Sequence, residues 1–236
     1  MEAFFRGDPG NAAVSVSVIV PTLNEASCIA ETLRRLRAQQ PAQIIVVDGG
    51  SSDKTCELAG SADLVLRGPR GRAAQMNLGA AHAVGDVLLF LHADCWLEAG
   101  ALADAEHSLS ARTAAACFTM QVEAQGWYYR SIDCCATARV RLTGLVYGDQ
   151  GLLVRRERFL RVGGFPTLGL MEDLFISRAL RRTGRVIVLP RRIYVSPRRW
   201  QQAGVMRQTL RNWTLTALAS GGVHPNRLAE FYPEVR

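Results

Sequence analysis

The chain has 236 residues, of which 48% are hydrophobic, and a formal net charge of +7. This length predicts a single domain, and the longest apolar runs are too short to cross a membrane, which excludes an integral membrane protein. The six cysteines form no CxxC pair and lack the spacing of zinc ligands, so we expect free thiols in a reducing cytosol.

The first half of the chain alternates strands with helices. Residues 14–20, ended by Pro21, 43–47, 62–66 and 87–92 are expected to be strands. Residues 26–38, 52–59, 73–83 and 98–109 are expected to be helices. This alternation predicts an α/β fold with a mostly parallel sheet covered on both faces.

The second half is less regular. We expect strands at residues 114–123, 151–154 and 185–189, the last ended by Pro190. We expect helices at residues 127–140, 156–162, 172–182 and 204–220. The apolar stripe of the last helix is expected to pack on the core, with docking on a membrane surface as the alternative. Its members are Val205, Met206, Leu210, Trp213, Ala217 and Leu218.

Charge is distributed unevenly between the two halves. Residues 1–129 hold 9 Lys and Arg against 14 Asp and Glu, a net charge of −5, whereas residues 130–236 hold 19 against 7, a net charge of +12. An acidic half joined to a basic half suggests that phosphates or anionic surfaces meet the second half.

Carboxylates stand where strands or loops pass into the next element. Asp48 follows the buried run at residues 44–47, Asp94 follows the strongly apolar run at 87–93, and Glu172-Asp173 begins a helix. Ligands of open α/β sheets bind at the carboxyl ends of strands, where such acids could hold a metal ion and act as a base. For Asp48 a turn role is an equal alternative, and Glu172 and Asp173 could simply cap their helix.

Two further features bear on ligands. Gly49-Gly50 would let a ligand approach the backbone, and the basic loop 67–72, which ends in Arg72, could neutralise phosphates or be only a solvated loop. His92 shares a strand face with Asp94 and is either a metal ligand or a hydrogen-bonded core residue. No G-x-G-x-x-G or Walker A motif follows the first strand, which argues against dinucleotide-dependent dehydrogenases and P-loop nucleotidases.

Together these segments resemble family-2 glycosyltransferases of the GT-A fold, over residues from about 15 to 200. The matching elements are Pro21-Thr22-Leu23-Asn24-Glu25, Asp48-Gly49-Gly50-Ser51-Ser52-Asp53, Asn77-Leu78-Gly79-Ala80, His92-Ala93-Asp94, Gly148-Asp149-Gln150-Gly151, Val162-Gly163-Gly164-Phe165, Glu172-Asp173 with Arg178, and Arg198-Arg199-Trp200. The chain looks most like a bacterial subgroup named radical-SAM/selenodomain-associated transferases, some of them associated with arsenosugar biosynthesis.

The resemblance implies a role for each site residue. The nucleotide would be bound by Pro21, Thr22, Glu25, Asp48, Gly49, Arg72 and Asp94. Asp94 would hold Mg²⁺ or Mn²⁺, with His92 as a second candidate ligand in place of the family's usual aspartate. Asp173 would be the catalytic base, beside Glu172. The acceptor side would contain Asp149, Gln150, Arg199 and Trp200.

From the resemblance we expect a metal-dependent inverting glycosyltransferase that uses a nucleotide-diphosphate sugar, with UDP-sugars favoured, and an unidentified hydroxyl acceptor. Residues 14–110 would form its nucleotide-binding half, 111–200 its acceptor-side half, and 201–236 a C-terminal helix and tail. The alternatives are a sugar-phosphate nucleotidyltransferase and a non-catalytic nucleotide-sugar-binding protein. We expect no nucleic-acid partner and no transmembrane segment.

The N-terminus, residues 1–13, is polar and does not resemble a signal peptide. We therefore expect a cytoplasmic protein, with peripheral contact at the inner face of the membrane as a further alternative. Because Ser196 replaces the glutamine of the Gln-x-x-Arg-Trp element that processive members carry, synthesis of a polymer is not expected.

Overall fold

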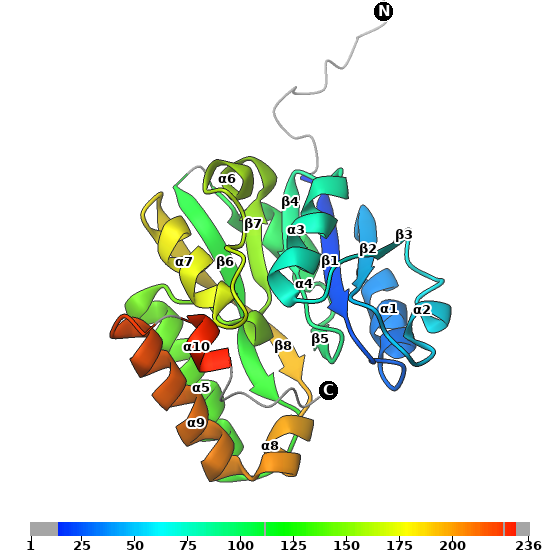
Figure 1. Cartoon of the computed structure of the whole chain (residues 1–236). Helices are drawn as coiled ribbons and strands as arrows, with labels where there is room; N and C mark the ends of the chain where they lie inside the picture. The colour runs from blue at the N-terminus through cyan, green and yellow to red at the C-terminus, as the bar shows by residue number, and fades with distance from the viewer. Residues whose placement is uncertain (1–13, 111, 224, 230–236) are drawn as a thin grey trace, which may run out of the picture.

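The computed structural model describes residues 14–110, 112–223 and 225–229. Its strands form one sheet in the order β3-β2-β1-β4-β7-β6-β8-β5, in which β7 and β5 run against the others (Figure 1). The α/β fold with a mostly parallel sheet is thereby confirmed. The strands are β1 (Val16–Thr22), β2 (Gln43–Asp48), β3 (Leu64–Arg67), β4 (Val87–Phe90), β5 (Cys95–Leu97), β6 (Thr113–Val122), β7 (Leu152–Arg155) and β8 (Arg185–Val195).

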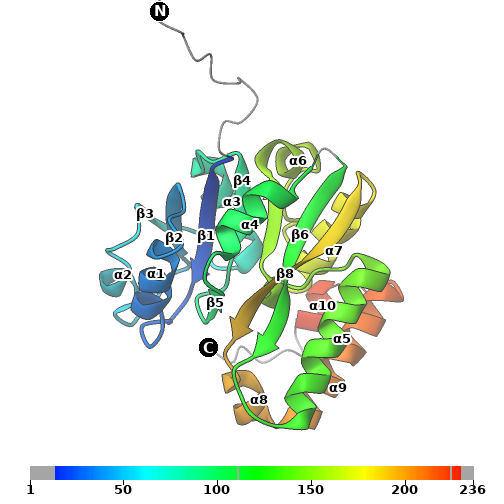
Figure 2. The ribbon, with the colours of Figure 1, turned by 180° about the vertical axis from the view of Figure 1, so that it is seen from behind.

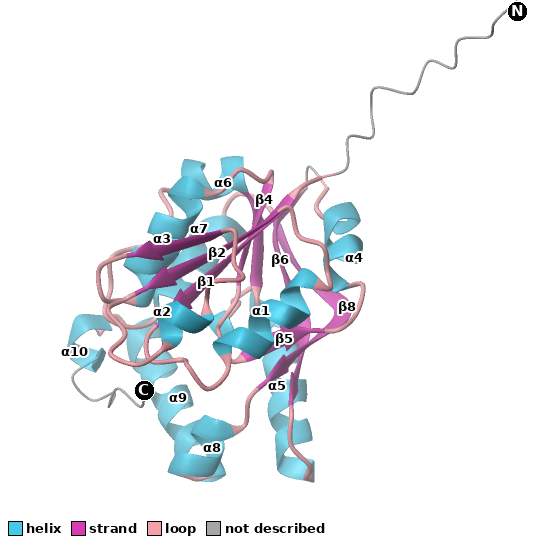
Figure 3. Cartoon of the chain, turned by 90° about the vertical axis from the view of Figure 1, so that its right-hand side faces the viewer, coloured by secondary structure: helices cyan, strands magenta, loops and turns pink. Residues whose placement is uncertain are grey.

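Helices cover both faces of this sheet (Figures 2 and 3). They are α1 (Ile29–Arg37), α2 (Thr55–Leu58), α3 (Arg72–His82), α4 (Ala101–Ser108), α5 (Trp127–Thr143), α6 (Arg156–Arg161), α7 (Glu172–Arg181), α8 (Arg198–Ala203), α9 (Val205–Ser220) and α10 (Pro225–Ala229), with a short 3₁₀ helix, η1 (Gly148–Gln150). Along β1, Val18 and Val20 pack in the cluster that includes α1 and α4, whereas Ile19 packs with α3, as alternation along a strand requires.

Two prolines do not end their strands, contrary to the sequence prediction. β1 continues through Pro21 to Thr22. The Ile19 carbonyl accepts the Leu91 amide, so the backbone nitrogen of Pro21 faces the same side, where β4 has already ended. Its missing N–H therefore costs no ladder bond.

The second proline, Pro190, lies within β8 rather than at its end. The pairing of β8 with β6 shifts register there: Phe118 pairs with Leu189 and the next residue, Thr119, pairs with Arg192. This bulge leaves Pro190 out of the ladder, and the Thr119 hydroxyl donates to the Leu189 carbonyl at 2.8 Å.

Of the stripe predicted on the C-terminal helix, Val205 packs against the core, but the prediction was wrong for most of the other members. On α9 the side chains of Met206, Leu210 and Trp213 are 79%, 55% and 60% exposed. The buried positions lie on another face: Leu215 and Ala219 pack with residues of α7 and α10. The short elements β5, α8 and α10 were also not predicted.

Within the described residues, no helix is both long and apolar enough to cross a membrane. The prediction for residues 1–13 lies outside the described residues, as does that for the tail beyond residue 229.

Candidate active site

The predicted site residues lie at one edge of the sheet, where β1, β2 and β4 end and β7 begins. Thr22 and Asp48 are paired at the ends of β1 and β2. β7 runs antiparallel to β4, so η1, which precedes it, comes to the edge at which β4 ends. In an α/β sheet this carboxyl edge is the usual place for a ligand.

Asp48 organises the loop that follows β2. Its Oδ2 accepts the amides of Gly50 and Ser51 at 2.9 and 2.8 Å, while Oδ1 accepts the hydroxyl of Ser51 and that of Thr22. Burial opposes ionisation, but the hydrogen bonds from Ser51 and Gly50 outweigh it and lower the pKa of Asp48. The turn role considered for Asp48 is thus present in the structure, with a carboxylate already shared among four donors.

Gln75, which the sequence analysis missed, supports this loop from α3. It is buried, and its Nε2 donates to the carbonyls of Thr22 and Val47 at 2.7 and 2.8 Å. A Cβ at position 49 would lie 3.0 Å from that nitrogen, so Gly49 is the residue that lets Gln75 approach. Its Oε1 is buried and has no hydrogen-bond partner among the described residues.

An arginine bridge joins the acids of the first half to the end of β8. Arg198 donates through Nη2 to both carboxylate oxygens of Glu25, at 2.9 and 2.7 Å, and its Nε lies 3.3 Å from Asp94 Oδ2. Both carboxylates belong to buried residues. Burial, followed by the charge of Glu25, raises the pKa of the adjacent Cys28 thiol to about 12. Arg199 and Trp200 were expected on the acceptor side; the contact with Glu25 and Asp94 comes from their neighbour Arg198, for which no role was predicted.

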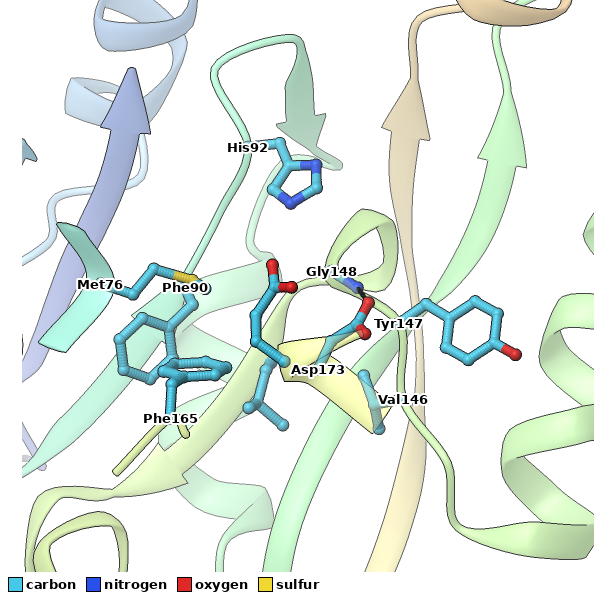
Figure 4. A pocket seen from close by; sticks show the side chains of 10 residues that line it. Met76, Phe90, His92, Val146, Tyr147, Gly148, Phe165 and Asp173 are labelled. Atoms are coloured by element: carbon cyan, nitrogen blue, oxygen red, sulfur yellow. Dashed lines mark hydrogen bonds between the residues drawn. The ribbon is translucent and has the colours of Figure 1, made fainter. Parts of the chain in front are cut away.

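His92, Gly148 and Asp173 adjoin one another (Figure 4). A Cβ on Gly148 would lie 2.6 Å from His92 Nε2, so the imidazole packs directly against a backbone that only glycine leaves open. The Gly148 amide donates to Asp173 Oδ2 at 2.9 Å, and the Leu174 amide donates to Oδ1 at 2.7 Å. Asp173 is therefore held in one orientation at the start of α7, where the helix dipole favours a carboxylate.

Glu172 has different surroundings from its neighbour. It is 3% exposed, and its Oε1 accepts Arg72 Nε at 2.8 Å, which ties the first residue of α7 to the first residue of α3. Arg72, expected at the phosphates, is thus engaged by Glu172. The preceding residue, Met171, has φ +64°, a left-handed conformation that costs a non-glycine residue free energy and is common beside active sites.

A further link joins the two halves of the chain. Asn77 on α3 donates through Nδ2 to the Phe165 carbonyl at 2.8 Å and accepts the Phe165 amide at 2.9 Å. A Cβ at Gly164 would lie 2.8 Å from Asn77 Oδ1. Two of the segments that carried the resemblance, around Asn77 and around Gly164-Phe165, therefore meet in a structural contact.

The residues around Asp94 can supply metal ligands. His92, Asp94 and Cys95 each offer one ligand atom, and these atoms lie within 4.8 Å of one another. Burial, followed by the charge of Asp94, raises the pKa of Cys95 well above its usual value, so this thiol is a poor donor. The Asp94 carboxylate fits Mg²⁺ or Mn²⁺ when substrate oxygens complete the coordination, whereas an imidazole ligand from His92 suits a transition metal better than Mg²⁺.

Of the expected acceptor residues, Asp149 and Gln150 belong to η1, Trp200 lines the same cavity as Asp149, and the charge of Arg199 acts on Asp149. Asp149, Trp200 and Tyr147 line a cavity of about 410 Å³ between α5 and α9. Gln150 is fully buried, and its Oε1 accepts Arg139 Nη2 at 2.5 Å. Burial raises the pKa of Asp149, and the neighbouring Arg139 partly opposes this shift.

Comparison with known proteins gives a consistent result. Residues 17–136 match the family described as Glycosyl transferase family 2. An uncharacterized glycosyltransferase of Mycobacterium tuberculosis is 37% identical over 111 residues, which are 43% of this chain and 42% of that protein. Glycosyltransferase AglE of Haloferax volcanii is 34% identical over 102 residues, 36% of this chain and 34% of that protein. The matches thus span less than half the length of these relatives.

Solved structures share the fold. Staphylococcus aureus TarS, residues 1–349 in complex with UDP-GlcNAc, superposes with a TM-score of 0.62 at 20% identity, covering 77% of this chain and 58% of that one. The mannosyltransferase PcManGT of Pyrobaculum calidifontis, in complex with GDP-Man and Mn²⁺, gives 0.60 at 23% identity, covering 80% and 58%.

Proposed function

The chain belongs to glycosyl transferase family 2, and on that basis we propose that it transfers a sugar from a nucleotide-diphosphate sugar to a hydroxyl acceptor with inversion at the anomeric carbon. Asp173 is the general base. The observation that carries this proposal is the contact series His92, Gly148, Asp173, since it puts the segment of Asp94 next to a fixed carboxylate.

Asp173 is suited to take a proton. Each of its oxygens accepts one backbone amide, which fixes the orientation and leaves a further lone pair for the proton of an attacking hydroxyl. That hydroxyl attacks the anomeric carbon from the face opposite the diphosphate, so one displacement inverts the configuration. Glu172 serves as a positioning residue, because its carboxylate is paired with Arg72.

The donor lies across the ends of β1, β2 and β4. The loop that Asp48 organises, in which Gly49 packs against Gln75, forms the surface for the nucleoside. Asp94 would hold Mg²⁺ or Mn²⁺, with His92 beside it, and a bound divalent cation would neutralise charge on the leaving diphosphate. We favour a UDP-sugar, although the neighbours include complexes with both UDP-GlcNAc and GDP-Man. The radical-SAM/selenodomain-associated subgroup stays a proposal that rests on the sequence resemblance.

The first experiment measures donor binding. Thermal unfolding is followed with UDP, GDP, CDP and dTDP, with and without Mn²⁺, for the wild type and Asp94→Ala. One nucleotide should stabilise the wild type in a manner that depends on Mn²⁺, and Asp94→Ala should remove this dependence. Stabilisation that is the same with and without Mn²⁺ would contradict the role of Asp94.

The second experiment measures turnover with the donor so identified, as release of nucleoside diphosphate across a panel of hydroxyl acceptors. Asp173→Asn should lower turnover about 10²- to 10⁴-fold, the usual contribution of a general base, and leave donor binding unchanged. Glu172→Gln is the matched control and should retain more activity than Asp173→Asn. Wild-type turnover in Asp173→Asn would disprove the assignment, and NMR of the product would test inversion.

A further inference from the structure

A second cavity lies outside the contact series of the active site. It has a volume of about 410 Å³, within the range of small-molecule sites, and lies between α5 and α9, which run side by side in Figures 1 and 2. Apolar side chains form much of its wall. They are Met120, Ile132, Ala136, Trp200, Trp213 and Ala217.

One end of the cavity is polar. Asp149 lies there, and its Oδ1 is buried without a hydrogen-bond partner in the described part of the chain. Arg139 lies over the ring of Tyr147, with its Cζ 3.3 Å from the ring centroid, and the Tyr147 hydroxyl is 2.8 Å from Thr216 Oγ1. A buried carboxylate oxygen without a donor is costly, and a ligand hydroxyl would satisfy it.

This polar end adjoins the proposed base. Tyr147 lines both this cavity and the pocket that contains Asp173. Asp149 follows Gly148, whose amide donates to Asp173. A molecule whose hydroxyl-bearing end lies at Asp149 is therefore next to the segment that contacts Asp173.

Part of the cavity wall consists of exposed apolar side chains. Trp213 lines the cavity and is 60% exposed, and Leu210, one turn before it on α9, is 55% exposed. Cys135 on α5 also lines the cavity and is exposed. A ligand with an apolar part could enter here and cover surface that otherwise faces water.

We propose that this cavity binds the apolar part of the acceptor, which is a small amphipathic alcohol. Its hydroxyl-bearing end lies at Asp149 and Gly148, and its apolar part lies between Ile132 and Trp213. The proposal rests on the proposed function for the reaction, but the cavity can be tested without turnover.

The probe is a series of straight-chain primary alcohols from butanol to decanol. Binding is read as protection of Cys135 from N-ethylmaleimide, in the Cys134→Ser variant. Cys134, also exposed but not part of the cavity, is followed in Cys135→Ser as the internal control. Affinity should rise about fourfold for each CH₂ and then level off when the cavity is full.

A variant that fills the cavity completes the test. Ala217→Trp should abolish the protection of Cys135, whereas Ala103→Trp, at an exposed position on α4 away from the cavity, should not. Both variants are first shown to unfold cooperatively and to bind the nucleotide with Mn²⁺ as the wild type does.

Equal protection of Cys134 and Cys135, or protection that survives Ala217→Trp, would overturn the proposal. Affinity that rises with chain length without levelling, together with competition by phosphatidylglycerol vesicles, would also overturn it in favour of a membrane-binding surface. If alcohols protect Cys135 but no nucleotide binds, the proposed function fails and the cavity remains a ligand site.

Discussion

Replacing Arg198 by methionine removes the cation that joins two buried carboxylates and keeps most of the apolar stem. Glu25 is 6% exposed and Asp94 is 6% exposed, and Arg198 lies within 2.7 Å of the first and 3.3 Å of the second. Removing one partner of a buried ion pair costs about 3–5 kcal/mol. Because the Arg198 side chain is 31% exposed, water replaces part of the lost interaction, and we expect a loss of about 2–3 kcal/mol.

Urea unfolding at pH 7.5 measures this loss directly. For a chain of this length a loss of about 2–3 kcal/mol lowers the melting temperature by about 4–12 °C. Arg34→Met is the matched control, because Arg34 pairs with Glu31 on the exposed side of α1, at 2.7 Å, where ion pairs contribute little. An unfolding free energy of Arg198→Met equal to that of the wild type would refute the bridge as a stabilising element.

The same variant tests a competition at Asp94. In the wild type a divalent cation bound at Asp94 would share that carboxylate with Arg198. Without the guanidinium, Mn²⁺ should raise the melting temperature more in Arg198→Met than in the wild type. An equal or smaller Mn²⁺ effect in the variant would show that the arginine does not compete for Asp94.

Three further predictions follow from contacts described above. Asn77→Ala removes both hydrogen bonds to the Phe165 backbone and should cost about 2–3 kcal/mol of unfolding free energy, measured by urea unfolding. Burial raises the pKa of Asp149 above the ordinary 3.8, so the folded state binds this proton more tightly and the wild type loses stability as pH rises through the folded pKa. Asp149→Asn should therefore gain stability relative to the wild type as pH rises above the ordinary pKa of 3.8; a difference that stays constant with pH would contradict this. Because the pKa of Cys28 is raised to about 12, its thiol should react with iodoacetamide at pH 8 far more slowly than the exposed Cys134, and equal rates would contradict the raised pKa.

The alternation of elements could be predicted because the parallel strands are buried on both faces and read as continuous apolar runs. Proline predicted the ends of strands less well. Its missing N–H costs no ladder hydrogen bond at Pro21, where β4 has already ended, or at Pro190, which lies in a bulge. Periodicity on α9 showed which residues share a face, but it could not show whether that face meets protein or solvent. Trp213 and Leu210 share a face that is exposed.

Residues of the candidate site could be proposed from the sequence only where a local pattern marks them. Asp94 and Asp173 stand at the boundaries of strongly patterned segments, and the structure puts both at the same edge of the sheet. Arg198 meets Glu25 across 173 residues of sequence, and no local pattern signals such a pair. Gln75 lies in the first turn of α3, where nothing in the sequence distinguishes it from a solvent-facing residue; its role depends on the contact with Gly49.

The two hydrogen bonds between the Asn77 side chain and the Phe165 backbone bear on whether the two halves of the chain could be exchanged between proteins. Asn77 recognises only main-chain atoms, so the hydrogen bonds are indifferent to which side chain stands at position 165. A chimera that keeps the first half of this chain could therefore accept a foreign second half, provided that the new backbone follows the same path and keeps a glycine at position 164. If the second half binds the acceptor, as we propose, acceptor specificity could then be changed by grafting that half, with the contact between Asn77 and Phe165 left as it is.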